Sequence, residues 1–599
     1  MPIKKLFLRS VSHIFFVLAL PAFSPIQAQS PRIFVDGFFD DWENIAPIYD
    51  DARGDNSDNA VDFGRLWMTN DDRFLYLRLE VGGEINLQND NQIVLYIDSD
   101  NDASTGKTVL GIGAELEWRF GQRSGTFYGP GQSFQIRYHA IGLVTLPTVT
   151  STEFEIAIDR ESRPGNNILF SSDSIRIAFS DLQSGGDMLP DSGEQITYHF
   201  NSMELPPLPP VSLEKQDDRH VRVMTYNVLR DRFFEPSVRE NYQRIFQALQ
   251  PEILGFEEIY DHSAGQAKDI VEALLPPSGG QQWYAAKQGT DVIAVSRFPI
   301  LKSQAIEGNG AFLLDLRARY YTDLLLIVAH PPCCANNEGR QQEIDAIMAF
   351  IRDAENGSQE FTIEAQTPIL IMGDMNLVGY AQQLQTFLKG EIVNKNIYGQ
   401  SFDPDWDGTA LADLAPYIAG YNMAFTWYDE NSSFSPGRLD YMIYTDSVLK
   451  TGNHFILFTP VLSEKMLQKY ALQKDDVLLA SDHLPVVGDF IFPRVDDVAR
   501  KHREKNAVHS TLLHNYPNPF NLSTRIIYNL QQPAHVRLRI MNIHGDEVKT
   551  LINAKQTAGK QATVWDGTDE KGVAVSSGIY FIYLQVDEQI YKSEILFIK

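Results

Sequence analysis

The stretch "LLASDHLPVVGDFIF", residues 478–492, places a carboxylate and an imidazole side by side, at Asp482 and His483, directly before an apolar run. The apolar run predicts a buried strand. Layered α/β proteins build their sites where buried strands end. The stretch therefore predicts a site at this end of the strand, completed by polar residues from the ends of other strands.

Residues 219–494 contain further apolar segments that end in or carry polar residues of the same chemical kind. These are "VRVMTYNV" with Asn227, "EILGFEEI" with Glu257 and Glu258, "LLLIVAH" with His330, "ILIMGDMN" with Asp374 and Asn376, and "GRLDYMIY" with Asp440. Between them, apolar residues recur at helical spacing, at i, i+3, i+4 and i+7. Strands that alternate with helices in this way predict an α/β domain.

The residue types in this set restrict the chemistry. Asn, Asp and Glu oxygens without paired Cys or His ligands favour a hard cation such as Mg²⁺, Mn²⁺ or Ca²⁺ over zinc. Two histidines remain for proton transfer or for contact with a phosphate, and Asp440 could orient one of them. Asp374 could hold or deprotonate an attacking water. A Gly-Asp pair or a histidine taken singly is more often a turn or a packing residue, so metal-assisted hydrolysis of a phosphate ester is predicted from the whole set.

Five motifs occur in a fixed order along this domain: "TYNV", "FEEI", "GDMN", "RLDY" and "SDHLP". In these motifs residues 219–494 resemble the endonuclease/exonuclease/phosphatase superfamily, which has the deoxyribonuclease-I-like fold. The resemblance implies a four-layered α/β sandwich with two central sheets. It also implies a divalent-metal-dependent phosphoesterase that uses Mg²⁺ or Mn²⁺.

The resemblance implies a role for each matching residue. It implies metal contact by Asn227, Glu258 and Asp482, alignment of the nucleophilic water by Asp374, phosphate binding by Asn376, and catalysis by His483 paired with Asp440. His330 matches a position that contacts phosphate or acts as an acid in several branches of the family. The chain departs from the family pattern at Glu257, where glutamine is usual, and in the prolines that follow His330.

The only two cysteines, Cys333 and Cys334, are adjacent and follow His330 closely. Adjacent Cα atoms lie about 3.8 Å apart, whereas an ordinary disulfide spans roughly 4.4 to 6.8 Å. A bridge between them would be a strained ring that stiffens the loop after His330. Two interpretations stay open: a vicinal disulfide at the rim of the site, or two reduced thiols without a role. Two ligands alone cannot close a thiolate metal site.

Residues 31–200 alternate apolar and polar side chains at period two, which predicts a β-sandwich. The segments "FVDGFFDDWENI" and "IVLYIDSDNDASTG" are similar to family 9-like carbohydrate-binding modules, which implies a glycan as a partner. Asp98, Asp100 and Asp102 alternate as in Ca²⁺-binding loops, and a solvated acidic turn is the alternative. Three tryptophans could stack on sugar or pack in the core: Trp42, Trp67 and Trp118.

Both ends of the chain indicate export. Residues 1–28 have the charged start, the short apolar run and the small-residue cleavage site of a secretory signal peptide. Residues 511–599, with "NYPNPFNLSTRIIYNL", resemble the sorting domain of type IX secretion, and an ordinary immunoglobulin-like module is the alternative. This implies the type IX machinery as a partner, passage through the periplasm, and a secreted or cell-surface protein. Two linkers are predicted: the proline-rich residues 201–218 and the residues 495–510.

A chain of 599 residues is too long for one core, and its 43% hydrophobic content is that of globular proteins. The net charge of −27 disfavours long nucleic acid and anionic membranes as bulk partners. We therefore predict a multidomain, secreted phosphoesterase that hydrolyses a phosphodiester, with DNA, RNA, a phospholipid or a small phosphoester as substrate. The alternative function is a non-catalytic surface protein that attaches to glycan through its N-terminal sandwich.

Overall fold

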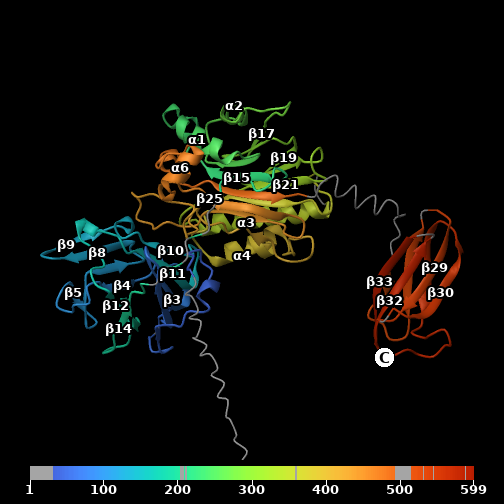
Figure 1. Cartoon of the computed structure of the whole chain (residues 1–599), viewed down its shortest axis with the longest axis horizontal. Coiled ribbons are helices and arrows are strands. Elements are labelled where there is room, and N and C mark those ends of the chain that lie inside the picture. The colour runs from blue at the N-terminus through green and yellow to red at the C-terminus, as the bar shows by residue number, and fades with distance from the viewer. Residues whose placement is uncertain are drawn as a thin grey trace, which may run out of the picture.

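The computed structural model describes residues 32–492 and 514–598, except residues 58, 203, 204, 206, 207, 209–211, 358–360, 531, 544, 587 and 588. The expected signal peptide and the linker expected at 495–510 lie outside the described residues. Figure 1 shows a β-rich N-terminal part, a central α/β part and a C-terminal β part. The predicted fold class, a central four-layered α/β sandwich flanked by two all-β sandwiches, is confirmed. Among the described helices, none is both long and apolar enough to cross a membrane.

The N-terminal part is a sandwich of two sheets. The five-stranded sheet has the order β1 (Tyr49–Asp50), β2 (Arg65–Asn70), β3 (Phe74–Ile85), β11 (Ser151–Asp159) and β10 (Val144–Leu146). The seven-stranded sheet has the order β13 (Met188–Leu189), β12 (Ser174–Asp181), β4 (Ile93–Asp98), β7 (Leu116–Arg119), β8 (Ser124–Gly129) and β9 (Gln132–Ile136), with β14 (Ile196–His199) also on β12. The hairpin β5 (Lys107–Val109) and β6 (Ile112–Ala114) is a separate pair.

The middle part contains two six-stranded sheets. The first has the order β17 (Tyr284–Gln288), β18 (Val292–Ser296), β16 (Ile253–Glu257), β15 (Val221–Asn227), β26 (Val486–Ile491) and β25 (Lys450–Ile456). The second has the order β19 (Ile300–Ile306), β20 (Asn309–Asp315), β21 (Asp323–Val328), β22 (Ile369–Asp374), β24 (Asp440–Tyr444) and β23 (Ala412–Asp413). The helices are α1 (Arg239–Leu249), α2 (Ala264–Leu274), α3 (Asn337–Asn356), α4 (Ala381–Lys389), α5 (Lys395–Tyr398), α6 (Glu464–Tyr470) and α7 (Asp476–Ala480).

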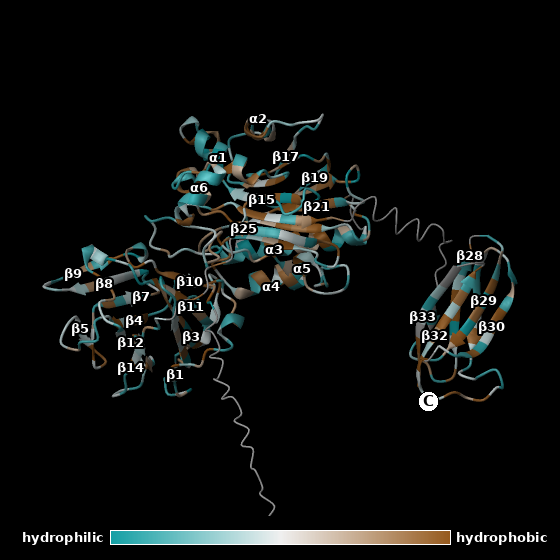
Figure 2. Ribbon diagram, in the orientation of Figure 1, coloured by the Kyte–Doolittle hydropathy of each residue, from teal (hydrophilic) through white to brown (hydrophobic). Residues whose placement is uncertain are grey.

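Strand β22 shows how the layers stack, because successive side chains of a strand point to opposite faces. Leu370 and Met372 belong to the hydrophobic cluster that includes β15 and helices α1 and α2. Ile369 and Ile371 belong to the cluster that includes helices α3 and α4. Helices therefore cover both outer faces while the two sheets pack against each other between them. In Figure 2 the strands of this centre are mostly brown, and the outer helices α1 and α6 are largely teal.

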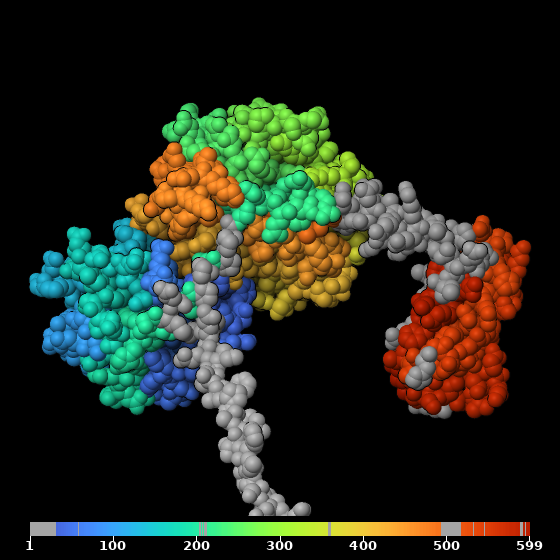
Figure 3. Space-filling model, viewed as in Figure 1, coloured from blue at the N-terminus to red at the C-terminus, as the bar shows by residue number. Residues whose placement is uncertain are grey.

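The outer face of the five-stranded sheet packs into the same hydrophobic cluster as the middle part, whereas a separate cluster fills the space between the two sheets of the sandwich. Val35 pairs with Met423 in a parallel bridge, and its N–H donates to the carbonyl oxygen of Asn422 at 3.0 Å. The Asn422 side chain donates to the carbonyl oxygen of Ile33 at 2.7 Å and to the Tyr76 hydroxyl. Figure 3 shows the two parts abutting. The sequence predicted separate cores, because no local pattern reveals that these faces pack together.

The structure bears on two alternatives that the sequence left open in the N-terminal part. All three candidate sugar-stacking residues are core residues, with exposed fractions of 1%, 4% and 2% for Trp42, Trp67 and Trp118. The acidic group that could hold an ion consists of Asp98, Asp100 and Glu115. Asp102 is not a member of this group. The Asp102 carboxylate instead accepts hydrogen bonds from Ser104, within its own turn.

The C-terminal part has a core of its own, formed by two sheets. One has the order β27 (His514–Tyr516), β28 (Thr524–Leu530) and β31 (Gly559–Trp565). The other has the order β30 (Glu547–Gln556), β29 (Ala534–Met541), β32 (Gly578–Val586) and β33 (Gln589–Phe597).

The shared core predicts that the N-terminal and middle parts unfold together. Trp42→Ala should destabilise this joint transition by about 3–5 kcal/mol, the usual cost of removing a buried tryptophan. Differential scanning calorimetry would measure it. Trp565→Ala is the matched control, because Trp565 belongs to the C-terminal core and should leave the joint transition in place. Two separate transitions for residues 32–202 and 212–492 would contradict a shared core.

Candidate active site

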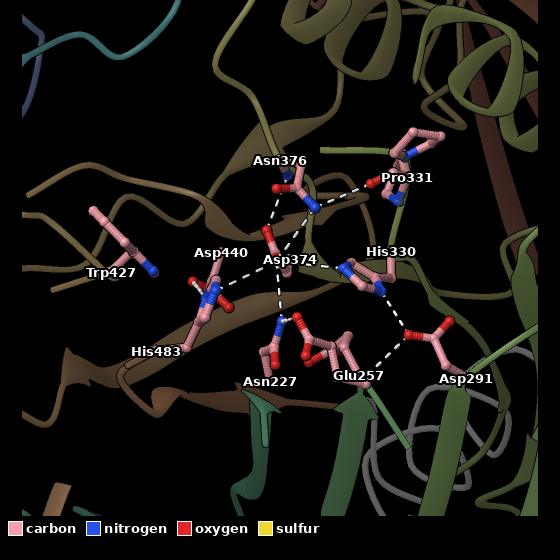
Figure 4. A network of polar contacts seen from close by, with 12 residues as sticks. Asn227, Glu257, Asp291, His330, Pro331, Asp374, Asn376, Trp427, Asp440 and His483 are labelled. Atoms are coloured by element: carbon pink, nitrogen blue, oxygen red, sulfur yellow. Dashed lines mark hydrogen bonds and ion pairs between the residues drawn. The ribbon is translucent and has the colours of Figure 1, made fainter. Parts of the chain in front are cut away.

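The predicted site residues meet because of how the strands are paired. β15 and β16 are parallel, so Asn227 and Glu257 lie side by side at their ends. In the second sheet, Asp374 ends β22 directly opposite Asp440, which begins the antiparallel β24. Figure 4 shows the polar side chains of both sheets converging around Asp374.

Gly373 is required in front of Asp374 by the close approach of the chain before His330. A Cβ on Gly373 would lie 2.0 Å from the carbonyl oxygen of Ala329, and its φ of +140° is one that other residues rarely adopt. The Ala329 N–H donates to the carbonyl oxygen of Met372 at 2.9 Å. The Gly-Asp sequence thus keeps Asp374 beside His330, which follows Ala329 in the chain.

The carboxylate of Asp374 is the centre of the site and is almost fully buried. Its Oδ2 lies 3.6 Å from Nε2 of His330 and 3.5 Å from Nε2 of His483. Asn227 Nδ2 donates to the same oxygen at 3.1 Å. The backbone N–H of Asn376 donates to Oδ1 at 3.0 Å. Donors from both sheets therefore converge on one carboxylate.

Each histidine is also paired with a second carboxylate through its Nδ1 atom. Nδ1 of His483 is 2.8 Å from Oδ2 of Asp440, as the sequence predicted. Nδ1 of His330 is 2.6 Å from Oδ2 of Asp291, a residue that the sequence analysis missed. Each pair turns Nε2 of its imidazole toward Asp374, so the site has two histidine–aspartate pairs on two sides of one carboxylate (Figure 4).

The neighbouring carboxylates favour the cationic form of both imidazoles. Burial lowers the pKa of His330, but its hydrogen bond with Asp291 and the charge of Asp374 outweigh burial and raise this pKa to about 9. Burial likewise lowers the pKa of His483, and the charges of Asp440 and Asp374 raise it well above its usual value. The positive charge of the two imidazoles beside Asp374 can attract an anionic group such as a phosphate.

Asp291 had a signal in the sequence. It stands directly before the apolar run of β18, as Asp482 stands before that of β26. Because β18 is antiparallel to β16, the start of β18 lies at the end of β16. The backbone N–H of Glu258 donates to Asp291 Oδ2 at 3.0 Å. Asp291 therefore positions both His330 and the segment that carries Glu258.

Two of the residues expected to hold a metal, Glu258 and Asp482, offer carboxylate oxygens of the kind that a hard divalent cation prefers. Asp482 Oδ2 accepts from Nε1 of Trp427 at 3.0 Å, whereas its Oδ1 is buried without a hydrogen-bond partner. Glu258 accepts from Asn227 Nδ2 at 3.2 Å and from the N–H of Arg230 at 2.9 Å. The Ser481 hydroxyl, beside Asp482, donates to the carbonyl oxygen of Asn227 at 2.8 Å. These oxygen donors suit Mg²⁺ or Mn²⁺.

Glu257 has a different environment from Glu258. Its side chain is fully buried in β16, and Oε1 accepts from the Thr225 hydroxyl at 2.9 Å. Oε2 has no partner. Burial raises the pKa of Glu257 well above its usual range, and the charge of Asp440 adds to this effect. The raised pKa favours the uncharged form of this carboxyl, which adds no negative charge to the site.

The loop after His330 is fixed by an arginine. Cys333 and Cys334 are free, exposed thiols, so the structure has the unbridged alternative. Arg340, fully buried, donates to the carbonyl oxygens of Pro332 at 3.0 Å and Cys334 at 2.8 Å. Asn376 Nδ2 donates to the carbonyl oxygen of Pro331 at 3.0 Å. These bonds hold the loop without a covalent bridge.

The N-terminal sandwich contacts the loop that follows Trp427. The Thr145 and Ser435 hydroxyls are 2.9 Å apart, and the N–H of Ser435 donates to Gln88 at 2.8 Å. The guanidinium of Arg123 lies over the ring of Phe434 at 4.1 Å. This loop begins at Trp427, whose indole N–H donates to Asp482. The first domain therefore supports one side of the site.

Comparison with known proteins finds two family models along the chain. Residues 224–483 match the model of the Endonuclease/Exonuclease/phosphatase family, and residues 522–589 match that of the FlgD Ig-like domain. No curated protein matches the chain. The middle of the chain therefore has the phosphoesterase-like fold of this family. The C-terminal match is to an immunoglobulin-like domain and does not test the predicted role in export.

Similar solved structures cover just under half of this chain. ANGEL2, a 2',3'-cyclic phosphatase, is 16% identical over 46% of this chain and 96% of that one, with a TM-score of 0.31. The human Nocturnin catalytic domain with bound sulfate is 16% identical over 47% of this chain and 99% of that one, with a TM-score of 0.29. An endonuclease/exonuclease/phosphatase family protein from Leptotrichia buccalis is 13% identical over 45% of this chain and all of that one, with a TM-score of 0.29.

Replacing each of the two adjacent glutamates by glutamine should have different effects on the affinity for the metal ion. Glu258→Gln should weaken Mg²⁺ or Mn²⁺ binding at least tenfold in titration calorimetry, because it removes a charged oxygen ligand. Glu257→Gln is the matched control and should leave the affinity unchanged, since its carboxyl is already neutral. Equal losses in both variants would show that Glu257 also binds the cation.

Asp291→Asn should lower the pKa of His330 from about 9 toward the ordinary 6.5, because it removes the main interaction that raises this pKa. NMR titration of the imidazole in the metal-free protein would measure the shift, with His330→Asn to assign the signal. The native pKa lies above the unfolded one. Stabilisation by this pair is therefore complete below pH 6.5 and is lost as pH rises through 9. An unchanged His330 pKa in the variant would contradict this pairing.

Proposed function

We propose that this chain is a divalent-metal-dependent phosphoesterase that hydrolyses a phosphodiester by attack of water. The supporting observation is the arrangement of His330 and His483 around Asp374, each held by its own carboxylate. One buried carboxylate and two cationic imidazoles meet the needs of phosphate-ester hydrolysis: a group that orients water, a group that offsets phosphate charge and an acid for the leaving oxygen.

In this proposal each side chain has one task. Asp374 orients the attacking water and accepts its proton. His330 and the Asn376 amide bind non-bridging phosphate oxygens and offset their charge. His483, kept protonated by Asp440, gives its proton to the oxygen of the leaving group. Because that proton comes from Nε2 while Nδ1 stays bonded to Asp440, the imidazole keeps its orientation through the transfer.

A divalent cation, Mg²⁺ or Mn²⁺, would be held by Asn227, Glu258 and Asp482. When bound, it supplies Lewis-acid polarisation of the phosphate and neutralises developing negative charge. The free Oδ1 of Asp482 supports this assignment, because a buried carboxylate oxygen without a partner is costly unless a cation or donor occupies the position.

We propose a compact phosphodiester as substrate. The chain has a net charge of −27, which repels a long polyanion along most of its surface. A short nucleotide or a headgroup ester needs only the positive charge at the two histidines. DNA, RNA and phospholipid remain outcomes of the substrate test.

We further propose that the protein is exported through the periplasm to the medium or cell surface, with residues 511–599 as a type IX sorting domain. The sequence motifs at both chain ends support this proposal. A purely glycan-binding role is less well supported, because the three tryptophans that could stack on sugar are buried. The complete set of polar residues in the middle domain favours catalysis.

The test compares the full mature chain with His483→Ala on plasmid DNA, RNA, sphingomyelin, bis(p-nitrophenyl) phosphate and p-nitrophenyl phosphate, with Mg²⁺ and with EDTA. Loss of a general acid should lower kcat by about 10²–10⁴-fold. His454→Ala is the matched control, since His454 is exposed on β25 and bonds only its local backbone. Equal rates for wild type and His483→Ala, or full activity in EDTA, would overturn the proposal.

A further inference from the structure

A group of carboxylates lies in the N-terminal sandwich, apart from the active site. One carboxylate oxygen from each of Asp51, Asp55 and Asp187 lies within 4.8 Å of the others. Asp51 follows β1 of the five-stranded sheet, and Asp187 precedes β13 of the seven-stranded sheet. The group therefore joins the two sheets of the sandwich at one place.

Asp51 is the decisive member of this group. Its exposed fraction is only 5%, and neither of its carboxylate oxygens has a hydrogen-bond partner. Within the described residues, no lysine, arginine or histidine forms an ion pair with any of the three carboxylates. Burial and the neighbouring charges of Asp187 and Asp191 raise the pKa of Asp51 to about 7. A buried carboxylate surrounded by like charges is strongly unfavourable without a cation.

Asp187, in contrast, is already held in place. Its carboxylate accepts the N–H of Phe63 at 2.6 Å and the N–H of Met188 at 2.7 Å. The N–H of Ser57 donates to the carbonyl oxygen of Gly185 at 3.0 Å, which ties the segment containing Asp55 to the loop before Asp187. Each Asp187 oxygen keeps a second lone pair, so the backbone has fixed the ligands while leaving them able to coordinate.

We infer that Asp51, Asp55 and Asp187 form a calcium site that fastens the two sheets of the N-terminal sandwich. Three carboxylates and no nitrogen or sulfur ligand suit a hard cation. Ca²⁺ accepts bidentate carboxylates and irregular geometry, and both oxygens of Asp51 are available on one side chain. Asp55 is exposed, so the site opens to solvent on one side. Mg²⁺ requires a stricter octahedron and is usually held by only one or two carboxylates, whereas three are present here.

The second acidic group consists of Asp98, Asp100 and Glu115. It differs from the first because its buried carboxylates already have partners in the protein. Asp98 pairs with Arg176 at 3.3 Å and accepts from the backbone N–H of Asp102. Glu115 accepts from the N–H of Ser99 and from the Thr105 hydroxyl. Protein donors already satisfy this group, so it carries no proposal.

Hydrogen–deuterium exchange on the full chain tests the calcium site at its own backbone. In EDTA, the amides of Phe63 and Met188 should exchange quickly, and millimolar CaCl₂ should slow them at least tenfold because their acceptor, Asp187, becomes fixed by the ion. The same concentration of MgCl₂ should have little effect. Calorimetric titration with CaCl₂ should show one equivalent fewer in Asp51→Asn than in wild type.

Two variants distinguish a role of Asp51 as an ion ligand from a purely structural role. Asp51→Asn should abolish the calcium effect on exchange, yet in EDTA it should be as stable as wild type or more stable, because it removes a repelled buried charge. Asp482→Asn is the matched control, since it alters the active site and should keep the calcium effect. Calcium protection that survives Asp51→Asn, equal protection by Mg²⁺, or a variant that is less stable in EDTA would each overturn the proposal.

Discussion

The burial of the Asp374 carboxylate is the constraint on which the rest of the middle domain depends. An ionised carboxylate is costly to bury unless donors and cations surround it. Here the donors come from the end of β15 through Asn227, from the chain beyond β21 through His330, and from the chain before β26 through His483. The site therefore forms only when the two sheets are correctly placed relative to each other. Its geometry depends on the packing of the whole domain.

The close packing of the two sheets satisfies that requirement. Gly255 in β16 faces Met372 in β22, where an added Cβ would come within 2.6 Å of the methionine methyl group. The missing side chain of Gly255 leaves room for Met372 to fill the space between the sheets. Gly373 has a different effect, because its missing side chain lets β22 lie close to Ala329, which follows the neighbouring strand β21 of the same sheet. A wider spacing between the sheets would leave Asp374 without its partner on β15.

The sequence revealed the polar strand ends but not all of their partners. Asn227, Asp374, Asp440 and His483 could be predicted because each interrupts or borders an apolar run, which a local pattern shows. Asp291 borders such a run as well, but its importance arises only from the antiparallel pairing of β18 with β16, which no local pattern contains. The three tryptophans were ambiguous for the same reason: side-chain type indicates a large apolar surface, and only the tertiary fold decides whether that surface is covered.

The N-terminal sandwich is best understood as part of the same structural unit as the middle domain. Thr145 and Gln88 hold Ser435, and the loop that contains Ser435 begins at Trp427, whose indole N–H holds Asp482. A rigid first domain therefore limits how far Asp482 can move, and an ion that fastens its two sheets would add to that rigidity. Because Asp482 and His483 are adjacent in the chain, the same support reaches the histidine. The order of the domains thus has a physical consequence: the first domain packs beside the loop that positions the last polar pair of the second.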